Sequence, residues 1–106
     1  MARALINVPA KARKGEIVEI KALVAHPMET GYRTGPDGAL VPRDIINRFL
    51  CTLNGQEVFS ADLFPAISAN PFISFTIRAE ESGTLAFRWF DDKGGAQVET
   101  AEIVVS

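Results

Sequence analysis

The sequence predicts an all-β fold, an immunoglobulin-like antiparallel β-sandwich of about seven strands. Two observations carry this prediction. Short segments in which apolar and polar residues alternate recur at intervals of about ten residues, a spacing typical of two-sheet sandwiches. Clusters of glycine, proline, asparagine and aspartate separate these segments, and no stretch shows the apolar period of a helix.

The first two predicted strands cover residues 3–8 and 16–25. Pro9 ends the first strand, because proline cannot donate a ladder hydrogen bond. The second strand places Glu19 and Lys21 on one face and four apolar residues on the other, namely Val18, Ile20, Ala22 and Val24. A strand with one polar and one apolar face is half-buried, so it is expected to cover one side of a core.

The third and fourth predicted strands form a hairpin. Residues 45–53 alternate, and their apolar face carries Phe49, Cys51 and Leu53. The dipeptide Asn54-Gly55 follows, and Asn-Gly between two such runs is a strong signal for a tight turn. Residues 57–63 then form a short returning strand that ends before Pro65.

Three further strands complete the prediction. The fifth opens after Asn70-Pro71, and its apolar face carries Ile73, Phe75, Ile77 and Ala79. A turn over residues 81–83 leads to the sixth, whose apolar face carries Leu85, Phe87 and Trp89. Trp89 is predicted to lie in the core between the sheets. A second hairpin turn over residues 91–95 precedes the seventh strand, residues 97–105.

Length and composition limit the classes of protein to consider. A chain of 106 residues with 47% apolar and 23% charged residues is expected to form one immunoglobulin-like domain over residues 1–106. The formal net charge of −2 argues against binding to nucleic acid or anionic lipid. Three basic residues near the start are interpreted as part of a solvated turn, namely Lys11, Arg13 and Lys14.

Location and redox state follow from two further features. No segment reaches the about 20 apolar residues that a membrane-spanning helix needs. Residues 1–9 are too short and too polar for a signal peptide, so the residues alone predict a cytoplasmic protein. The single cysteine, Cys51, excludes an internal disulfide. Its mid-strand position favours an inert core thiol, while a bridge to another chain stays open.

The connection from His26 to Arg43 is longer than most in a compact domain, and long ordered loops often carry function. It holds the only histidine of the chain, and no nucleophile–base pair can be built from it, so no catalytic residue is predicted. His26 and Met28 offer ligands suited to copper, and a copper-binding sandwich is the alternative interpretation. Otherwise Met28 is an apolar plug and His26 caps the strand end.

Apolar residues around the loops and the fourth predicted strand exceed the needs of one core. They are Leu40, Val41, Ile45, Ile46, Phe59, Leu63, Phe64, Ile67 and Phe72. A surplus of this kind marks a surface that a partner covers. The alternative is that the loops fold back and bury these side chains within the chain itself.

Several motifs occur in a fixed order along nearly the whole chain. They are HPMETG at 26–31, PRDIIN at 42–47, FLCT at 49–52, Asn54-Gly55, EVFSAD at 57–62, Pro65-Ala66 and SANP at 68–71. In type, order and spacing these motifs resemble the SoxZ family, the Z subunit of the sulfur-oxidation (Sox) carrier complex.

The resemblance implies a non-catalytic scaffold subunit without cofactors or metals. SoxZ proteins pair with a SoxY-type subunit, which carries the intermediates of thiosulfate and sulfide oxidation on a cysteine in a flexible glycine-rich C-terminal segment. The present sequence ends Glu102-Ile-Val-Val-Ser106 and is similar to the scaffold half of that pair. The family also implies a heterodimer that can enter larger assemblies, transient contacts with other Sox enzymes, and a periplasmic location reached by export with the partner.

The start of the long connection is predicted to belong to the surface on which the partner or a Sox enzyme docks. Met28 and Tyr32 offer adaptable apolar contact. Glu29 and Arg33 either contact the partner or pair with each other. The full set of predicted partner-binding residues is His26, Met28, Glu29, Tyr32, Arg33, Ile45, Phe59, Phe64 and Phe72.

Overall fold

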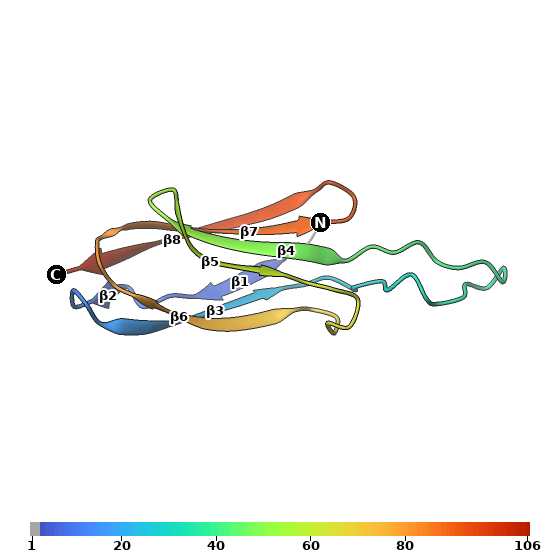
Figure 1. Cartoon of the computed structure of the whole chain (residues 1–106), viewed down its shortest axis with the longest axis horizontal. Coiled ribbons are helices and arrows are strands. Elements are labelled where there is room, and N and C mark those ends of the chain that lie inside the picture. Colours follow the sequence, from blue (N-terminus) through green and yellow to red (C-terminus); the bar gives the residue numbers. More distant parts are fainter. Residues whose placement is uncertain (1–2) are drawn as a thin grey trace.

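A computed structural model of the protein describes residues 3–106, which form an all-β sandwich of two sheets (Figure 1). Eight strands lie within these residues: β1 (Ala4–Asn7), β2 (Lys11–Ala12), β3 (Ile17–Val24), β4 (Ile46–Leu53), β5 (Gln56–Asp62), β6 (Phe72–Arg78), β7 (Gly83–Asp91) and β8 (Ala96–Val105). The predicted immunoglobulin-like fold and all seven predicted strands are confirmed. The described part of the chain contains no helix of the length and hydropathy needed to cross a membrane.

One sheet has three strands in the order β1-β3-β6, and the other has five in the order β2-β8-β7-β4-β5. All neighbouring pairs are antiparallel except β2 and β8, which run parallel. The interpretation of the basic segment as a solvated turn is wrong for its first residue, because Lys11 and Ala12 form β2 and pair with Val104 and Val105. The Ala12 side chain is buried, whereas the side chains of Lys11, Arg13 and Lys14 are exposed.

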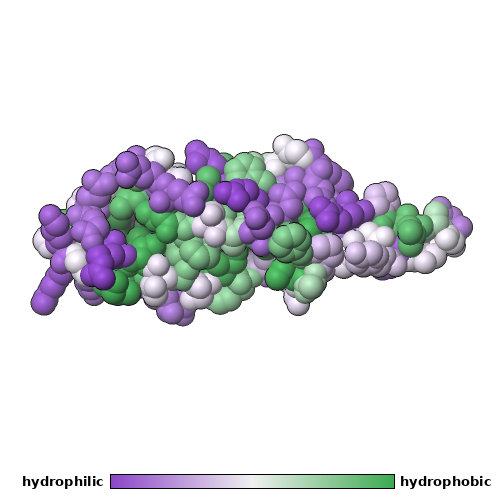
Figure 2. All heavy atoms as spheres, in the orientation of Figure 1, coloured by the Kyte–Doolittle hydropathy of each residue, from purple (hydrophilic) through white to green (hydrophobic). Residues whose placement is uncertain are grey.

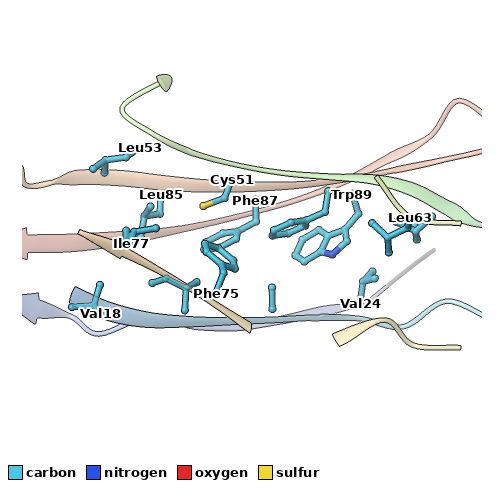
Figure 3. Close-up of a cluster of buried hydrophobic side chains, with 14 of the residues drawn as sticks. Val18, Val24, Cys51, Leu53, Leu63, Phe75, Ile77, Leu85, Phe87 and Trp89 are labelled. Atoms are coloured by element: carbon cyan, nitrogen blue, oxygen red, sulfur yellow. The ribbon is translucent and has the colours of Figure 1, made fainter. Parts of the chain in front are cut away.

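The predicted apolar faces of the long strands form the core. Phe49 lies at its centre, and its ring centroid is 5.3 Å from that of Trp89 and 5.9 Å from that of Phe75. Figure 3 shows Phe75, Phe87 and Trp89 filling the space between the sheets, with Cys51 also pointing inward. Trp89, Phe87, Phe49 and Cys51 are all 0% exposed, which confirms the predicted core position of Trp89. Close packing of this kind supplies most of the stability of a small sandwich.

The predicted Asn-Gly hairpin turn is present between β4 and β5. Asn54 and Gly55 both have positive φ, 51° and 85°, as a type I′ turn requires. The Asn54 side chain accepts a hydrogen bond from the Thr84 backbone N–H and donates one to the Ser82 carbonyl. Any side chain at Gly83 would overlap Asn54, so this glycine permits the close approach of the turn to the start of β7.

Candidate partner-binding surfaces

The long connection forms an extended ribbon, here called the projecting hairpin (residues 26–43), which leaves one end of the sandwich (Figure 1). The Val41 backbone N–H donates to the Arg33 carbonyl between its two legs, and at its base Glu29 exchanges two backbone hydrogen bonds with Asp44, the residue after the hairpin. A turn at Gly38, with φ of 82°, closes the tip. The ribbon lengthens the molecule, whose principal extents are 58 × 20 × 18 Å. Most of its residues are therefore exposed away from the core.

Met28 is buried at the base of the projecting hairpin and holds it against the start of β4. Its φ of 53° lies in the left-handed region, and its side chain is only 4% exposed. The Met28 backbone N–H donates to His26 Nδ1 at 3.0 Å, and its sulfur accepts a hydrogen bond from the Ile46 N–H at 3.2 Å. A left-handed backbone at a non-glycine residue costs about 1 kcal/mol or more, which these contacts offset. Met28 therefore acts as the predicted apolar plug.

A group of hydrogen bonds to the Asp92 carboxylate joins the end of the projecting hairpin to the β7–β8 turn. Arg43 donates two hydrogen bonds to the Asp92 carboxylate, at 2.8 and 3.0 Å. The same carboxylate accepts from the backbone N–H of Ile45 and from the side chain of Asn47. The hydrogen bonds from Arg43 hold the pKa of Asp92 at about 2, below its ordinary value of 3.8. Four donors on one carboxylate fix the direction in which the projecting hairpin leaves the sandwich.

The exposed middle of the projecting hairpin carries one charged pair and two large apolar side chains. Glu29 and Arg33 pair with each other, with an N–O distance of 2.6 Å, which confirms that alternative. The hydrogen bond from Arg33 lowers the pKa of Glu29. Tyr32 is 80% exposed and Leu40 is 64% exposed. Most of the surface of these two side chains is exposed to solvent, so they are available to contact a partner.

A second apolar surface lies on the outer face of the three-stranded sheet. Leu5, Leu23 and Phe72 occupy neighbouring strands in direct register, so they form one row across β1, β3 and β6. Leu5 is 65% exposed and Phe72 is 60% exposed, and the row lines a shallow hollow of about 420 Å³. We call these three residues the outer apolar row. Apolar residues in adjacent strands of an outer face are typical of a surface that another protein covers.

Apolar residues also reach the surface between the two layers. Figure 2 shows them as a band along the near side of the molecule, with polar residues above and below. The edge strands β5 and β6 lie on this side (Figure 1). The partly buried residues Phe59, Ala61 and Ile73 of these strands pack against the core from this edge. The side of the sandwich is thus less completely covered than its centre.

The nine predicted partner-binding residues fall into three groups. His26, Met28 and Ile45 are buried, so the isolated chain does not present them. Phe59 is half-buried at the edge of the core. The other members are at least partly exposed, on the projecting hairpin, after β5 or at the start of β6: Glu29, Tyr32, Arg33, Phe64 and Phe72.

Of the apolar surplus around the loops, Ile45, Ile46 and Leu63 are buried within the chain, whereas Leu40, Phe64, Ile67 and Phe72 are exposed. The sequence interpretation missed Leu5, which shares the outer apolar row with Phe72. Alternation gave no signal for this exposure, because Leu5 shares its predicted strand face with the polar residues Arg3 and Asn7.

One nitrogen of the His26 imidazole and the Met28 thioether, the groups considered for a copper site, already have hydrogen-bond partners. The Nδ1 atom of His26 and the sulfur of Met28 each accept a backbone N–H, as described above. Within residues 3–106 there is no group of three or more His, Cys, Asp or Glu side chains placed to hold a metal ion. Burial raises the pKa of the Cys51 thiol to about 12, which keeps it protonated and unreactive.

The fold and these surfaces define an immunoglobulin-like sandwich protein that exposes a row of apolar side chains on its three-stranded sheet and two more on a projecting hairpin. A family model described as sulphur oxidation protein SoxZ matches residues 6–102. The chain therefore belongs to the SoxZ family and is a protein of the Sox system. No curated protein matches it.

Solved structures with this fold carry several different functions. A superoxide reductase (neelaredoxin) from Ignicoccus hospitalis is 19% identical, with a TM-score of 0.73, and the match covers 97% of this chain and 80% of that one. The sulfur carrier protein SoxY from Chlorobium limicola f thiosulfatophilum is 17% identical, with a TM-score of 0.67 and coverage of 97% and 78%. At these identities the matches show the fold alone.

Proposed function

We propose that this protein is a non-catalytic scaffold subunit that binds a SoxY-type sulfur carrier and presents it to the enzymes of thiosulfate and sulfide oxidation. Two findings support this role: the chain belongs to the SoxZ family, and its ordered motifs resemble those of that family. The observation that carries the proposal is the outer apolar row, because Leu5 and Phe72 are 65% and 60% exposed on a rigid sheet. Such a surface costs free energy in water and is stabilised when a partner covers it.

The outer apolar row is well placed to centre an interface. A stable interface buries about 800 Å² per partner and has an apolar core with a polar rim. Around the row the same sheet face carries Lys21, Glu19 and Ser74, which are polar and exposed or partly exposed. The projecting hairpin then adds a second, separate contact for the carrier or for a Sox enzyme, with Tyr32 and Leu40 as its exposed apolar groups.

The side chains that enzymes use as nucleophile and base are unsuited to catalysis here. The Cys51 thiol is 0% exposed and its pKa is raised to about 12. His26 is 9% exposed and its Nδ1 atom already accepts a hydrogen bond. A buried thiol and an occupied imidazole nitrogen support a role in which the partner carries the chemistry.

The test is co-expression with a SoxY-type subunit, followed by size-exclusion chromatography with mass analysis. The proposal expects a stable 1:1 pair. Leu5→Asp and Phe72→Asp are each expected to weaken pairing by at least about tenfold, because they place a charge at the centre of an apolar interface. Circular dichroism confirms that each variant is folded.

Val104→Asp is the matched control, because Val104 is 54% exposed on the five-stranded sheet. If Leu5→Asp and Phe72→Asp bind the SoxY-type subunit as tightly as the wild-type chain does, the interface does not include the outer apolar row. A loss of pairing in Val104→Asp alone would assign it to the five-stranded sheet. A chain that forms no pair with any SoxY-type subunit would overturn the scaffold role.

We place the pair in the periplasm, as the family resemblance implies, with export of the folded chain on its partner. The test is fractionation of cells that produce this chain with a SoxY-type subunit whose export signal is intact or deleted. The chain is expected in the periplasmic fraction only when the partner signal is intact. A periplasmic chain in cells without the partner would contradict export on the partner.

A further inference from the structure

The outer face of the five-stranded sheet carries an arginine near its middle. Arg88 belongs to β7, an interior strand with β4 on one side and β8 on the other. Its chain neighbours Phe87 and Trp89 are both 0% exposed, and Figure 3 shows them pointing into the core. Because side chains alternate along a strand, the Arg88 side chain points away from the core, where it is partly exposed.

The four positions that surround Arg88 on this face are all apolar. Leu50 of β4 and Val98 of β8 lie directly opposite it in the two neighbouring strands. Ala86 and Phe90 lie two residues before and after it in β7. Val98 is 46% exposed, and the other three are partly exposed. We call these five residues the Arg88 patch. Side chains in such positions are close enough to contact one another and the same partner.

The Arg88 guanidinium forms no ion pair with any carboxylate of residues 3–106. Two acidic residues at the margin of the same face already have partners. Asp62 accepts a hydrogen bond from Arg48 at 2.9 Å, and Glu102 accepts one from the Thr84 hydroxyl at 2.6 Å. A guanidinium in an apolar ring is complementary to a carboxylate on another molecule, because the pair gains strength when apolar groups exclude water around it.

The position of this charge limits what can cover the Arg88 patch. A two-fold contact between copies of the chain centred on the patch would bring two Arg88 side chains together, and like charges repel. Nucleic acid is bound through several cations at once, whereas this patch has a single cation in a chain of net charge −2. The partner that fits is a protein surface with an acidic side chain at its centre and apolar side chains around it.

We propose that the Arg88 patch is a second docking surface, for a Sox enzyme that presents a carboxylate surrounded by apolar side chains. This inference rests on the scaffold function proposed above. The outer apolar row belongs to the other sheet, so both surfaces can be occupied at once (Figure 1). Permanent interfaces are the more apolar ones, and charges in transient interfaces steer the approach of the partner. The uncharged row therefore suits a permanent subunit, and the Arg88 patch suits an enzyme that binds and leaves.

The test uses the pair formed with a SoxY-type subunit, whose mass is first measured by size-exclusion chromatography. Each purified Sox enzyme is then titrated onto the immobilised pair by biolayer interferometry. Arg88→Glu is expected to leave pairing unchanged and to weaken the binding of at least one enzyme by at least about tenfold. Arg88→Leu is expected to weaken it as well, because it leaves the carboxylate of the enzyme unpaired, whereas a purely apolar contact would keep its affinity.

Arg13→Glu is the matched control, because Arg13 is exposed, lies after β2 and undergoes the same change of charge outside the patch. Its pair is expected to bind each enzyme as the wild-type pair does, and circular dichroism confirms that every variant is folded.

Four outcomes would overturn the proposal. If no enzyme binds the wild-type pair, or if Arg88→Glu binds every enzyme as tightly, the patch is not an enzyme surface, and the scaffold role stands. Loss of pairing in Arg88→Glu would assign the patch to the SoxY-type subunit. A dimer of the isolated chain that Arg88→Glu abolishes would assign it to a second copy. A wild-type chain that forms no pair would overturn the scaffold role and this inference with it.

Discussion

The rings of Phe59 and Phe75 stack across the two sheets, with centroids 4.2 Å apart and planes inclined by 9°. Phe59 belongs to β5 and Phe75 to β6, which are edge strands of different sheets. The stack therefore joins the two layers on the side where Figure 2 shows apolar residues near the surface. It closes a side of the sandwich on which no backbone hydrogen bonds link the two edge strands within the described chain.

Phe59→Ala is expected to lower the free energy of unfolding by about 2 kcal/mol, because it removes the stack and leaves Phe75 partly uncovered. Phe64→Ala is the matched control. Phe64 is 64% exposed, so its loss is expected to change stability by less than about 0.5 kcal/mol. Urea unfolding of the isolated chain measures both values. Equal stability of the two variants would contradict a structural role for the stack.

Asp92→Asn is expected to destabilise the chain by about 1–3 kcal/mol, since the Ile45 N–H and Arg43 lose a charged acceptor. The control is Asp62→Asn. Asp62 pairs with Arg48, but its side chain is 63% exposed, so the loss is expected to stay below about 1 kcal/mol. Urea unfolding compares the two. If Asp92→Asn lowers the free energy of unfolding less than Asp62→Asn does, the hydrogen bonds to Asp92 contribute little to stability.

The same carboxylate predicts a dependence of stability on pH. The pKa of Asp92 is about 2 in the folded chain and has an ordinary value of 3.8. A depressed pKa contributes stability that is fully present above the ordinary value and is lost as the pH falls through about 2. The wild-type chain is therefore expected to lose more stability than Asp92→Asn between about pH 4 and pH 2. Thermal melting in that range measures the difference, and parallel curves would contradict the prediction.

The Cys51 thiol is expected to resist modification in the folded chain. Its side chain is 0% exposed and its pKa is raised to about 12, so almost no thiolate is present at about pH 8. A chromogenic disulfide reagent should react slowly with the native chain and fully within the mixing time in denaturant. Rapid reaction of the native chain, or an interchain disulfide on a non-reducing gel, would contradict this expectation.

Tyr32→Ala is expected to leave the stability of the isolated chain within about 0.5 kcal/mol, because the side chain is 80% exposed. It is expected to weaken binding to a SoxY-type subunit or to a Sox enzyme at least about fivefold, since exposed tyrosines often anchor interfaces. Thr34→Ala, an exposed residue on the same hairpin leg, is the control. Unchanged pairing and unchanged thiosulfate-dependent turnover in Tyr32→Ala would remove the projecting hairpin from the interface.

The strands could be predicted because their signals are local. Alternation in residues 16–25 and the Asn54-Gly55 dipeptide specify a strand and a turn without help from distant residues. β2 was missed because two residues contain no period, and its pairing with Val104 and Val105 depends on the far end of the chain.

The sequence left open whether Met28 and Ile45 face a partner or are buried within the chain, and in the structure both are buried. Their burial depends on packing between the base of the projecting hairpin and the start of β4, where the Ile46 N–H donates to the Met28 sulfur. A pocket of about 360 Å³ at the base of the projecting hairpin shows the same limit, since Asp44, Trp89 and Gln97 line it from three separate segments of the chain.

The parallel pairing of β2 has a consequence for solubility. β2 covers only Val104 and Val105 of β8, so within the described chain residues 96–103 have no strand on that edge. An open edge of this length is a template for edge-to-edge polymerisation. Glu99 and Glu102 lie along it, and two copies that met there would bring like charges together. Repulsion between these carboxylates therefore disfavours pairing of two copies along this edge.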